Sequence, residues 1–498
     1  MPTSPSPAPF LRRLLPLAAL AAAAAVPAAE PEFIADRLEL FADRHLVEQA
    51  RNVQFAVGTP RAENIVFQFD EPWEGPMSGC YVTVLKDGDL YRMWYRGARK
   101  GADGLYDRHS DLTCYAESRD GITWVKPRLG LHEFKGSREN NIVWPSGEPR
   151  IAHNFSVMLD DRPGVPADQR YKAVGGTKSH GLVRLASADG LRWRILPLAP
   201  LFKDYALDTM NVLTWSPAEQ VYAIYLRTWT HGGTPQHPAF VGARTISRSV
   251  SQDFVTWSEP EPMTFGDTPT EDLYTNATHP YFRAPHILIA LPLRFVNNRQ
   301  ALTAAELEAW NVNPNQRTSV SDAVLLTSRG GNAYDRTHME AFLRPGLDRK
   351  SWFGRDLYPA LGVVPTGPEE MSLYVTTHFT LPDYHLRRYS LRTDGFASVR
   401  APYTGGEVVT KPVRFSGSKL VINYSSSAAG GVRVELLDAA GRPIPGYTEK
   451  ESADIVGDEI ARPVAWNGKE GLERLRGLAV KVRFVLRDAD LYSFRFAP

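Results

Sequence analysis

The chain has 498 residues, which is enough for two or more domains with separate hydrophobic cores. Its 57 Lys and Arg residues balance 56 Asp and Glu residues, and no basic tract or nucleic-acid motif is present, so nothing in the sequence indicates nucleic acid as a partner. The 38 Gly, 38 Pro and many aromatic residues favour a turn-rich, all-β protein.

The first 29 residues have the features of a signal peptide. Arg12 and Arg13 form a short positive region, and a run rich in Ala and Leu follows over residues 14–26. This run is shorter than the roughly 20 apolar residues that span a bilayer, and no Cys follows it that could carry a lipid. We therefore expect a secreted or periplasmic protein that begins near Glu30 and has no membrane anchor.

One short motif recurs along the chain. Three full copies, at residues 118–124, 187–193 and 251–257, share Ser, Asp and a final Trp. Degenerate copies occupy residues 328–334 and 392–396. Each copy ends a β-rich run with a turn, and Asp-Gly is the strongest short signal for such a turn. Five related units indicate a repeat architecture.

Each unit contains an inner strand, a second strand and a third strand that ends in the motif. The segment ENIVF at residues 63–67 resembles NNIVW at 140–144, the outer strand of the first unit, although it precedes that unit. A strand in this position can complete the last blade and remove the open edges of the ring. The sequence therefore predicts a five-bladed β-propeller over residues 30–403, closed by a strand near 63–67.

Three segments depart from the repeats. Residues 33–50 are expected to form a partly helical lead-in, and the insert at 298–316 is expected to contain a helical turn. From residue 404 to 498, alternating apolar residues and Gly-containing turns predict a C-terminal β-sandwich.

Only two cysteines are present, Cys80 and Cys114. The repeat places them on strands with another strand between them, a separation of ~9.6 Å, which exceeds the ~7 Å limit between the Cα atoms of a disulfide. We expect two free, buried thiols.

The repeat also predicts where chemistry would lie. The inner strand of a blade starts on the face where the second strand ends, so residues at these points converge around the propeller axis. Many of the residues there are charged, polar or aromatic, which suits a sugar substrate, although acids at strand starts also bind backbone amides of neighbouring blades. The candidate substrate-binding residues are Trp73, Arg96, His153, Asn154, Lys178, Asn211, Arg227, Trp229, Asp272, Tyr274, Asn276, Arg294, Asp356 and His378.

Two motifs carry a family resemblance, YRMWYRG at residues 91–97 and YAESRDGITW at 115–124. Together with the C-terminal sandwich, they resemble the five-bladed-propeller glycoside hydrolases, which include arabinanase- and xylosidase-like and invertase- and levanase-like families. The invertase-type Asn-Asp-Pro-Asn-Gly motif is absent. The resemblance implies no required cofactor, although a structural calcium occurs in such enzymes, and no ligand spacing here indicates a metal.

The resemblance also implies three catalytic carboxylates at the starts of inner strands. By position these are Glu74 in blade one, Asp208 as the middle acid and Glu271 as the general acid, with Asp70 and Asp356 as reserves. Glycoside hydrolysis needs one protonated and one ionised carboxyl group, and a neighbouring cation keeps the second ionised.

The expected activity is therefore hydrolysis of a poly- or oligosaccharide. The basic residues among the candidates favour an anionic glycan that carries uronate or sulfate, because Arg binds such groups with two parallel hydrogen bonds. Two alternatives remain: a glycoside phosphorylase that holds phosphate on these residues, and a non-catalytic glycan-binding propeller in which the acids are structural.

Overall fold

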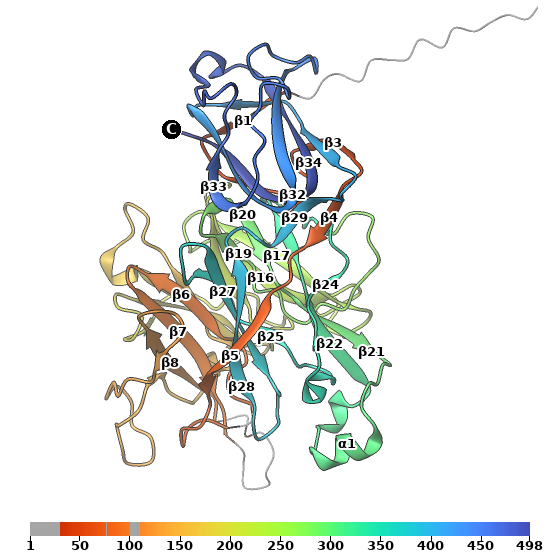
Figure 1. Cartoon of the computed structure of the whole chain (residues 1–498). Coiled ribbons are helices and arrows are strands. Elements are labelled where there is room, and N and C mark those ends of the chain that lie inside the picture. Colours follow the sequence, from red (N-terminus) through yellow and green to blue (C-terminus); the bar gives the residue numbers. More distant parts are fainter. Residues whose placement is uncertain (1–29, 76, 100–106, 108–109) are drawn as a thin grey trace, which may run out of the picture.

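The computed structural model describes residues 30–75, 77–99, 107 and 110–498. The signal peptide predicted for residues 1–29 lies outside this part of the chain. The described chain is almost entirely β-structure and forms a five-bladed β-propeller and a β-sandwich (Figure 1). No helix in the described ranges is long and apolar enough to cross a membrane.

Blades one to three are antiparallel sheets of consecutive strands. Blade one contains β6 (Thr83–Asp87), β7 (Leu90–Gly97), β8 (Leu112–Ser118), β9 (Trp124–Val125) and β10 (Ile142–Trp144). Blade two contains β11 (Ser156–Leu159), β12 (Tyr171–Thr177), β13 (Gly181–Ser187) and β14 (Arg194–Ile195). Blade three contains β15 (Val212–Ser216), β16 (Val221–Trp229), β17 (Arg244–Ser251) and β18 (Glu261–Pro262).

Blade four is divided into two three-stranded sheets because Pro292, which has no N–H group, interrupts its second strand. One sheet contains β19 (His279–Tyr281), β20 (Ala284–Ala290) and β23 (Leu326–Ser328), and the other contains β21 (Leu293–Asn297), β22 (Ser319–Val324) and β24 (Ala341–Leu343). The insert contains helix α1 (Ala304–Ala309), whose capping box joins Thr303 and Glu306, so the predicted helical turn is confirmed. This helix lies at the end of the molecule opposite the sandwich (Figure 1).

The N-terminal part of the chain completes blade five. This blade contains β25 (Tyr358–Pro359), β26 (Val364–Pro365), β27 (Glu370–Thr377), β28 (His385–Arg392) and β5 (Arg61–Gln68). Strand β5 pairs antiparallel with β28, with Gln68 opposite His385 and Arg61 opposite Ser390. It includes the segment whose sequence matches an outer strand, and its pairing closes the ring.

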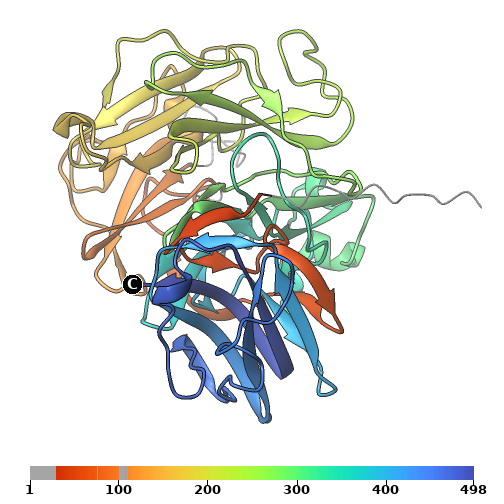
Figure 2. The same ribbon diagram turned by 90° about the horizontal axis from the view of Figure 1, so that it is seen from above.

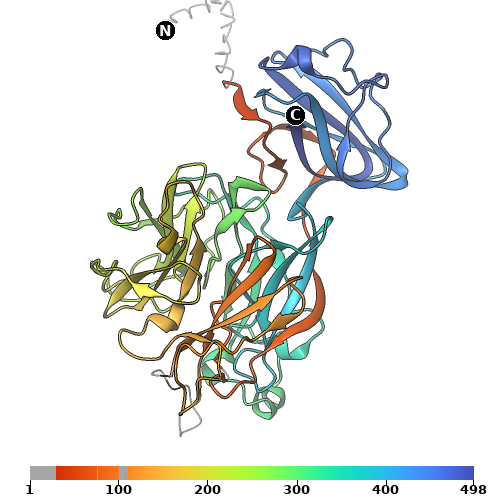
Figure 3. The ribbon, with the colours of Figure 1, turned by 90° about the vertical axis from the view of Figure 1, so that its left-hand side faces the viewer.

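The sandwich contains strands from both ends of the chain (Figures 2 and 3). Its C-terminal strands are β29 (Ala397–Ala401), β30 (Gly406–Thr410), β31 (Val413–Phe415), β32 (Lys419–Asp438), β33 (Asp458–Pro463) and β34 (Val480–Ala497). Its N-terminal strands are β1 (Glu32–Ala35), β2 (Glu39–Leu40), β3 (Val47–Arg51) and β4 (Gln54–Val57).

The helical prediction for residues 33–50 is therefore wrong. Ile34, Phe41 and Leu46 pack into the sandwich core, and β30, β31 and β34 supply backbone partners to this segment. Tertiary pairing overrides the local pattern here. Residues 32–57 belong to the sandwich sheet and not to the propeller to which the sequence assigned them.

The recurring motif is structural. In the first copy, one carboxylate oxygen of Asp120 accepts hydrogen bonds from the N–H groups of Ile122 and Thr123, both at 2.7 Å. The last two copies join the propeller to the sandwich. Arg329 pairs with Glu39 and Asp43, and Asp394 accepts hydrogen bonds from sandwich side chains.

The expectation for the two cysteines is confirmed, because both are free and buried.

Candidate active site at the propeller axis

Side chains from all five blades meet at the end of the axis where the inner strands begin. The centre of this axial cluster is Tyr81, whose phenol donates a hydrogen bond to the backbone oxygen of Asp208 at 3.2 Å. The ring centroid of Tyr81 lies 6.2 Å from that of His153 and 5.2 Å from the guanidinium carbon of Arg96. The axial cluster is Tyr81, Arg96, His153, Asp208, Arg227, Tyr274, Arg355 and Tyr358.

The strand register explains this convergence. Tyr81, Asp208 and Tyr358 precede or open inner strands, whereas Arg96 and Arg227 lie near the ends of second strands. Tyr81 and Arg355 also have left-handed backbone conformations, with φ of 61° and 66°. Such conformations are costly for residues other than glycine and are concentrated at functional sites.

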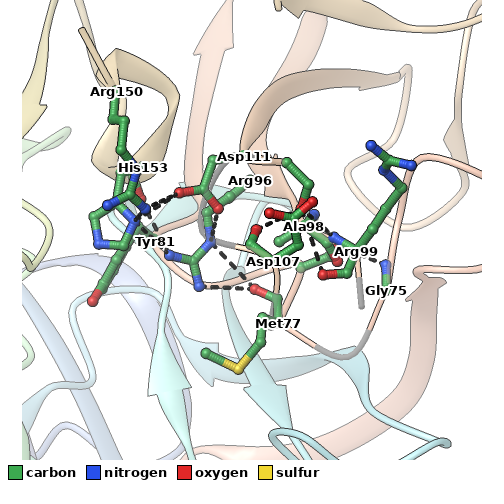
Figure 4. A network of polar contacts seen from close by, with 12 residues as sticks. Gly75, Met77, Tyr81, Arg96, Ala98, Arg99, Asp107, Asp111, Arg150 and His153 are labelled. Carbon is green, nitrogen blue, oxygen red and sulfur yellow. Dashed lines mark hydrogen bonds and ion pairs between the residues drawn. The ribbon is translucent and has the colours of Figure 1, made fainter. Parts of the chain in front are cut away.

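One side of the cluster is a polar network around Asp111 (Figure 4). The buried Asp111 carboxylate lies 2.9 Å from Nδ1 of His153 and 2.7 Å from the Arg150 guanidinium. Burial lowers the pKa of His153, the Arg96 and Arg150 charges lower it further, and Asp111 only partly opposes them. The imidazole is therefore neutral near neutral pH. The sequence prediction missed Asp111 because the residue precedes the third strand of a blade instead of the first.

Asp208 is the one predicted catalytic carboxylate within the axial cluster. Its side chain is 68% exposed and forms an ion pair with Arg227, which is only 5% exposed. The Arg227 guanidinium thus holds the Asp208 carboxylate at the open side of the cluster. This arrangement suits a carboxylate that faces a substrate.

An aromatic surface lies beside Asp208. Trp229 contacts Arg227 through a cation–π interaction at 4.7 Å and stacks on Phe240 with ring centroids 4.4 Å apart. Phe240 is 57% exposed, and the Lys178 ammonium lies 5.5 Å from its ring. Exposed aromatic rings are suitable surfaces for the apolar faces of sugars. Phe240 was not predicted, because it lies in a loop without repeat signals.

The structure places Glu74 inside blade one. Its side chain is fully buried, and its oxygens accept hydrogen bonds from Tyr95 at 2.6 Å and Lys126 at 2.8 Å. Burial raises the pKa of Glu74 against the opposing effects of Lys126 and Tyr95. The neighbouring Trp73 is also buried and donates a hydrogen bond to Asn141 at 2.8 Å. Both side chains are thus held by partners inside blade one.

Glu271 is held between two arginines of blade four, at 2.9 Å from Arg336 and 2.8 Å from Arg294. Burial would raise the pKa of Glu271, but these two arginines outweigh it and lower the pKa. A general acid needs the opposite shift, because it must be protonated before it donates. The structure thus does not assemble Glu74, Asp208 and Glu271 in one site.

Several other predicted residues have structural contacts. Asp356 is fully buried and accepts a hydrogen bond from the Phe379 N–H at 2.9 Å, and burial raises its pKa to about 6. His378 lies 2.8 Å from Asp348. The remaining residues of this kind are Asn154, Asn211 and Asn276, which bond backbone groups, Asp272, which pairs with Arg244, and Arg294, which pairs with Asp322 as well as Glu271.

Within the described residues, no group of three or more His, Cys, Asp or Glu side chains could hold a metal ion.

Comparisons with known proteins give distant similarities. No protein-family model matches the chain. Two uncharacterized proteins from Mycobacterium tuberculosis strains are 29% and 30% identical over 133 residues, which is 27% of this chain. The chain spans 38% of the length of these relatives.

Similar solved structures are proteins that act on carbohydrates. An N-acetylgalactosamine deacetylase from F. plautii, in complex with blood group B trisaccharide, is 12% identical (68% of this chain, 96% of that chain, TM-score 0.44). A family 43 arabinoxylan arabinofuranohydrolase from Bacillus subtilis is 12% identical (88% and 99%, TM-score 0.38). An α-L-arabinanase from Penicillium chrysogenum is 8% identical (67% and 98%, TM-score 0.37). The propeller assignment itself rests on the strand pairing of this chain.

Proposed function

We propose that this chain is an exported enzyme that cleaves glycosidic bonds of an anionic poly- or oligosaccharide at the axial cluster. The observation that carries the proposal is the convergence of cationic, phenolic and acidic side chains from all five blades, beside the exposed ring of Phe240. Arginines suit an acidic sugar, and Asp208 and the phenols supply groups that can move protons.

Hydrolysis is the route that the sequence predicts. In the structure it would use Asp208 as the ionised carboxylate that activates water or attacks the anomeric carbon. Glu74 and Glu271 do not join Asp208 in the axial cluster, so the second group of this route would come from other axial residues. Its nearest candidates in the described structure are the phenols and the Asp111–His153 pair.

The test is cleavage of a panel of neutral and acidic glycans by the mature protein, followed by the variant Asp208→Asn. Asp168→Asn is a matched control, because Asp168 is also exposed and paired with an arginine but lies in blade two, near Arg194. We expect Asp208→Asn to reduce cleavage by roughly 10²-fold or more and Asp168→Asn to leave it unchanged. Equal activity of both variants would exclude Asp208 as the carboxylate of the hydrolytic route.

The same assay separates the alternatives. Cleavage that requires inorganic phosphate and releases a sugar phosphate would identify a phosphorylase. Binding without turnover on every glycan, unaffected by Asp208→Asn, would identify a glycan-binding protein.

A further inference from the structure

Three guanidinium groups surround the ring of Tyr274. Their central carbons lie 5.3 Å (Arg227), 5.3 Å (Arg244) and 5.2 Å (Arg355) from the ring centroid. The Tyr81 side chain lies beside Tyr274 as well. Positive charges this close to a phenol favour its ionised form.

Tyr81 and Tyr274 are adjacent phenols with opposite tendencies. Burial would raise the pKa of Tyr274, but the Arg355 and Arg227 charges and the Tyr81 hydrogen bond outweigh it and lower the pKa. Burial and the neighbouring Tyr274 raise the pKa of Tyr81 well above its usual value. Two neighbouring groups whose pKa values are driven apart can serve as the base and the acid of one reaction.

Arg355 differs from the other two arginines in its partners. Arg244 makes two hydrogen bonds to the Asp272 carboxylate, and Arg227 pairs with Asp208. Among the described residues, no carboxylate lies within ion-pair distance of Arg355, and its buried Nε has no hydrogen-bond partner. An arginine held in a strained backbone conformation without a carboxylate partner is suited to bind an anionic group of a ligand.

We propose that Tyr274 and Tyr81 are the proton-transfer pair of a β-elimination that cleaves the glycan at a uronate residue whose carboxylate binds Arg355. This inference rests on the proposed function, because it assigns the reaction of the same axial cluster. The substrate class is a polysaccharide or oligosaccharide with uronate residues linked through C4.

The chemistry is balanced without another reactant. The C5 proton of a uronate is α to its carboxylate, and Arg355 stabilises the negative charge that develops there when the proton leaves. The Tyr274 phenolate takes this proton, the electron pair forms the C4–C5 double bond, and the C4–O bond breaks. The leaving oxygen takes the phenolic proton of Tyr81. Transfer of a proton from Tyr274 to Tyr81 then restores the starting state.

The partners of the acids favour this route over hydrolysis by two carboxylates. The Glu74 and Glu271 carboxylates are bound within blades one and four. The phenols, in contrast, are grouped at the axis beside the neutral His153 and Arg355, for which the described part of the chain supplies no carboxylate. Elimination needs one base, one acid and a cation for the carboxylate, and the axial cluster contains all three.

The first experiment needs no substrate. The ultraviolet absorbance of tyrosinate is followed during pH titration of the wild type, Tyr274→Phe and Tyr225→Phe. Tyr225 is a matched control because it is buried and its hydroxyl makes no hydrogen bond. Its pKa, in contrast, is raised to about 12. We expect the earliest step of the wild-type titration to vanish in Tyr274→Phe and persist in Tyr225→Phe. An unchanged titration in Tyr274→Phe would overturn the proposal. The groups that face Tyr274 are Tyr81, Tyr358, Cys80, Arg227, Arg244 and Arg355.

The second experiment identifies the products. Polygalacturonate, alginate and hyaluronan are digested by the full-length mature protein in water labelled with heavy oxygen. We expect unsaturated uronate ends without the label, and a loss of roughly 10²–10⁴-fold in rate for Tyr274→Phe. Saturated products that carry the label would overturn the elimination while leaving glycosidic cleavage intact. Cleavage of neutral glycans without cleavage of any of the three uronate polymers would also refute the elimination. Inactivity on all glycans tested would contradict the proposed function as well.

Discussion

The charged groups inside the blades and those at the propeller axis consist of the same residue types in different environments. Inside the blades, carboxylates and cations bind each other: Glu271 lies between Arg294 and Arg336, and Glu74 binds Lys126. At the axis, Asp208 pairs with Arg227 but is open to solvent, and Arg355 has no carboxylate partner among the described residues. Residue type and strand position therefore do not distinguish a structural acid from a reactive one, whereas the partners of the acid do.

Inside the blades, the substitution Glu271→Gln should cause the largest loss of stability. The variant leaves Arg336, whose side chain is fully buried, without its charge partner, which should lower the free energy of unfolding by about 3–5 kcal/mol. Denaturant unfolding measures this, with Glu308→Gln on the exposed side of α1 as the control. Activity per folded molecule should be retained. Loss of activity with unchanged stability would show that Glu271 is a catalytic residue after all.

Acid should weaken the contact between the propeller and the sandwich. Burial would raise the pKa of Glu39, but nearby His286 and Arg329 outweigh it and lower the pKa to about 2. A carboxylate with a lowered pKa stabilises the fold above its unfolded pKa, and this contribution, about 3 kcal/mol, is lost as the pH falls from about 5 to 2.

Unfolding measured at pH 7 and pH 3 should therefore show a larger loss of stability in the wild type than in Glu39→Gln. Equal losses would mean that the Glu39–Arg329 pair contributes nothing to the acid sensitivity of the fold.

At the axis, Arg355→Lys should weaken substrate binding without lowering the stability of the fold. Lysine keeps the charge but cannot make two parallel hydrogen bonds to a carboxylate, so we expect KM for a uronate polymer to rise roughly 10-fold. The free energy of unfolding should change by less than about 0.5 kcal/mol, because lysine keeps the charge beside Tyr274 and no carboxylate among the described residues loses a partner. A large loss of stability with unchanged KM would place Arg355 among the structural arginines.

Asp120→Ala, in the first copy of the recurring motif, should cause only a small loss of stability. Loss of the hydrogen bonds to the turn amides should cost about 1 kcal/mol of unfolding free energy, with unchanged kcat and KM. Thermal unfolding and a standard activity assay measure both quantities. A change in kcat would show that the motif contributes to the active site as well as to the turn.

The repeat made much of the fold predictable from the sequence. The match between residues 63–67 and 140–144 anticipated the pairing of β5 with β28, and the Pro and Gly positions marked the turns. The lead-in at 33–50 was not predictable, because its strands exist only through pairing with β30, β31 and β34, more than 300 residues away.

The site was predictable only in part for the same reason. Strand position identified Asp208, Arg227 and Tyr274, which do lie at the axis. It could not separate them from Glu271, whose role depends on Arg336, a residue in a distant loop. Tyr81 was not selected for the site, because its importance follows from the side chains that surround it.

A crystal structure of the Tyr274→Phe variant with a bound uronate oligosaccharide would test the proposed site most sharply. We expect the uronate carboxylate to lie on Arg355, with the sugar ring against Tyr81 and its chain passing Asp208 and Phe240. Binding at the opposite end of the axis, in the cavity of about 450 Å³ lined by Leu159, Trp215 and Val363, would contradict this placement.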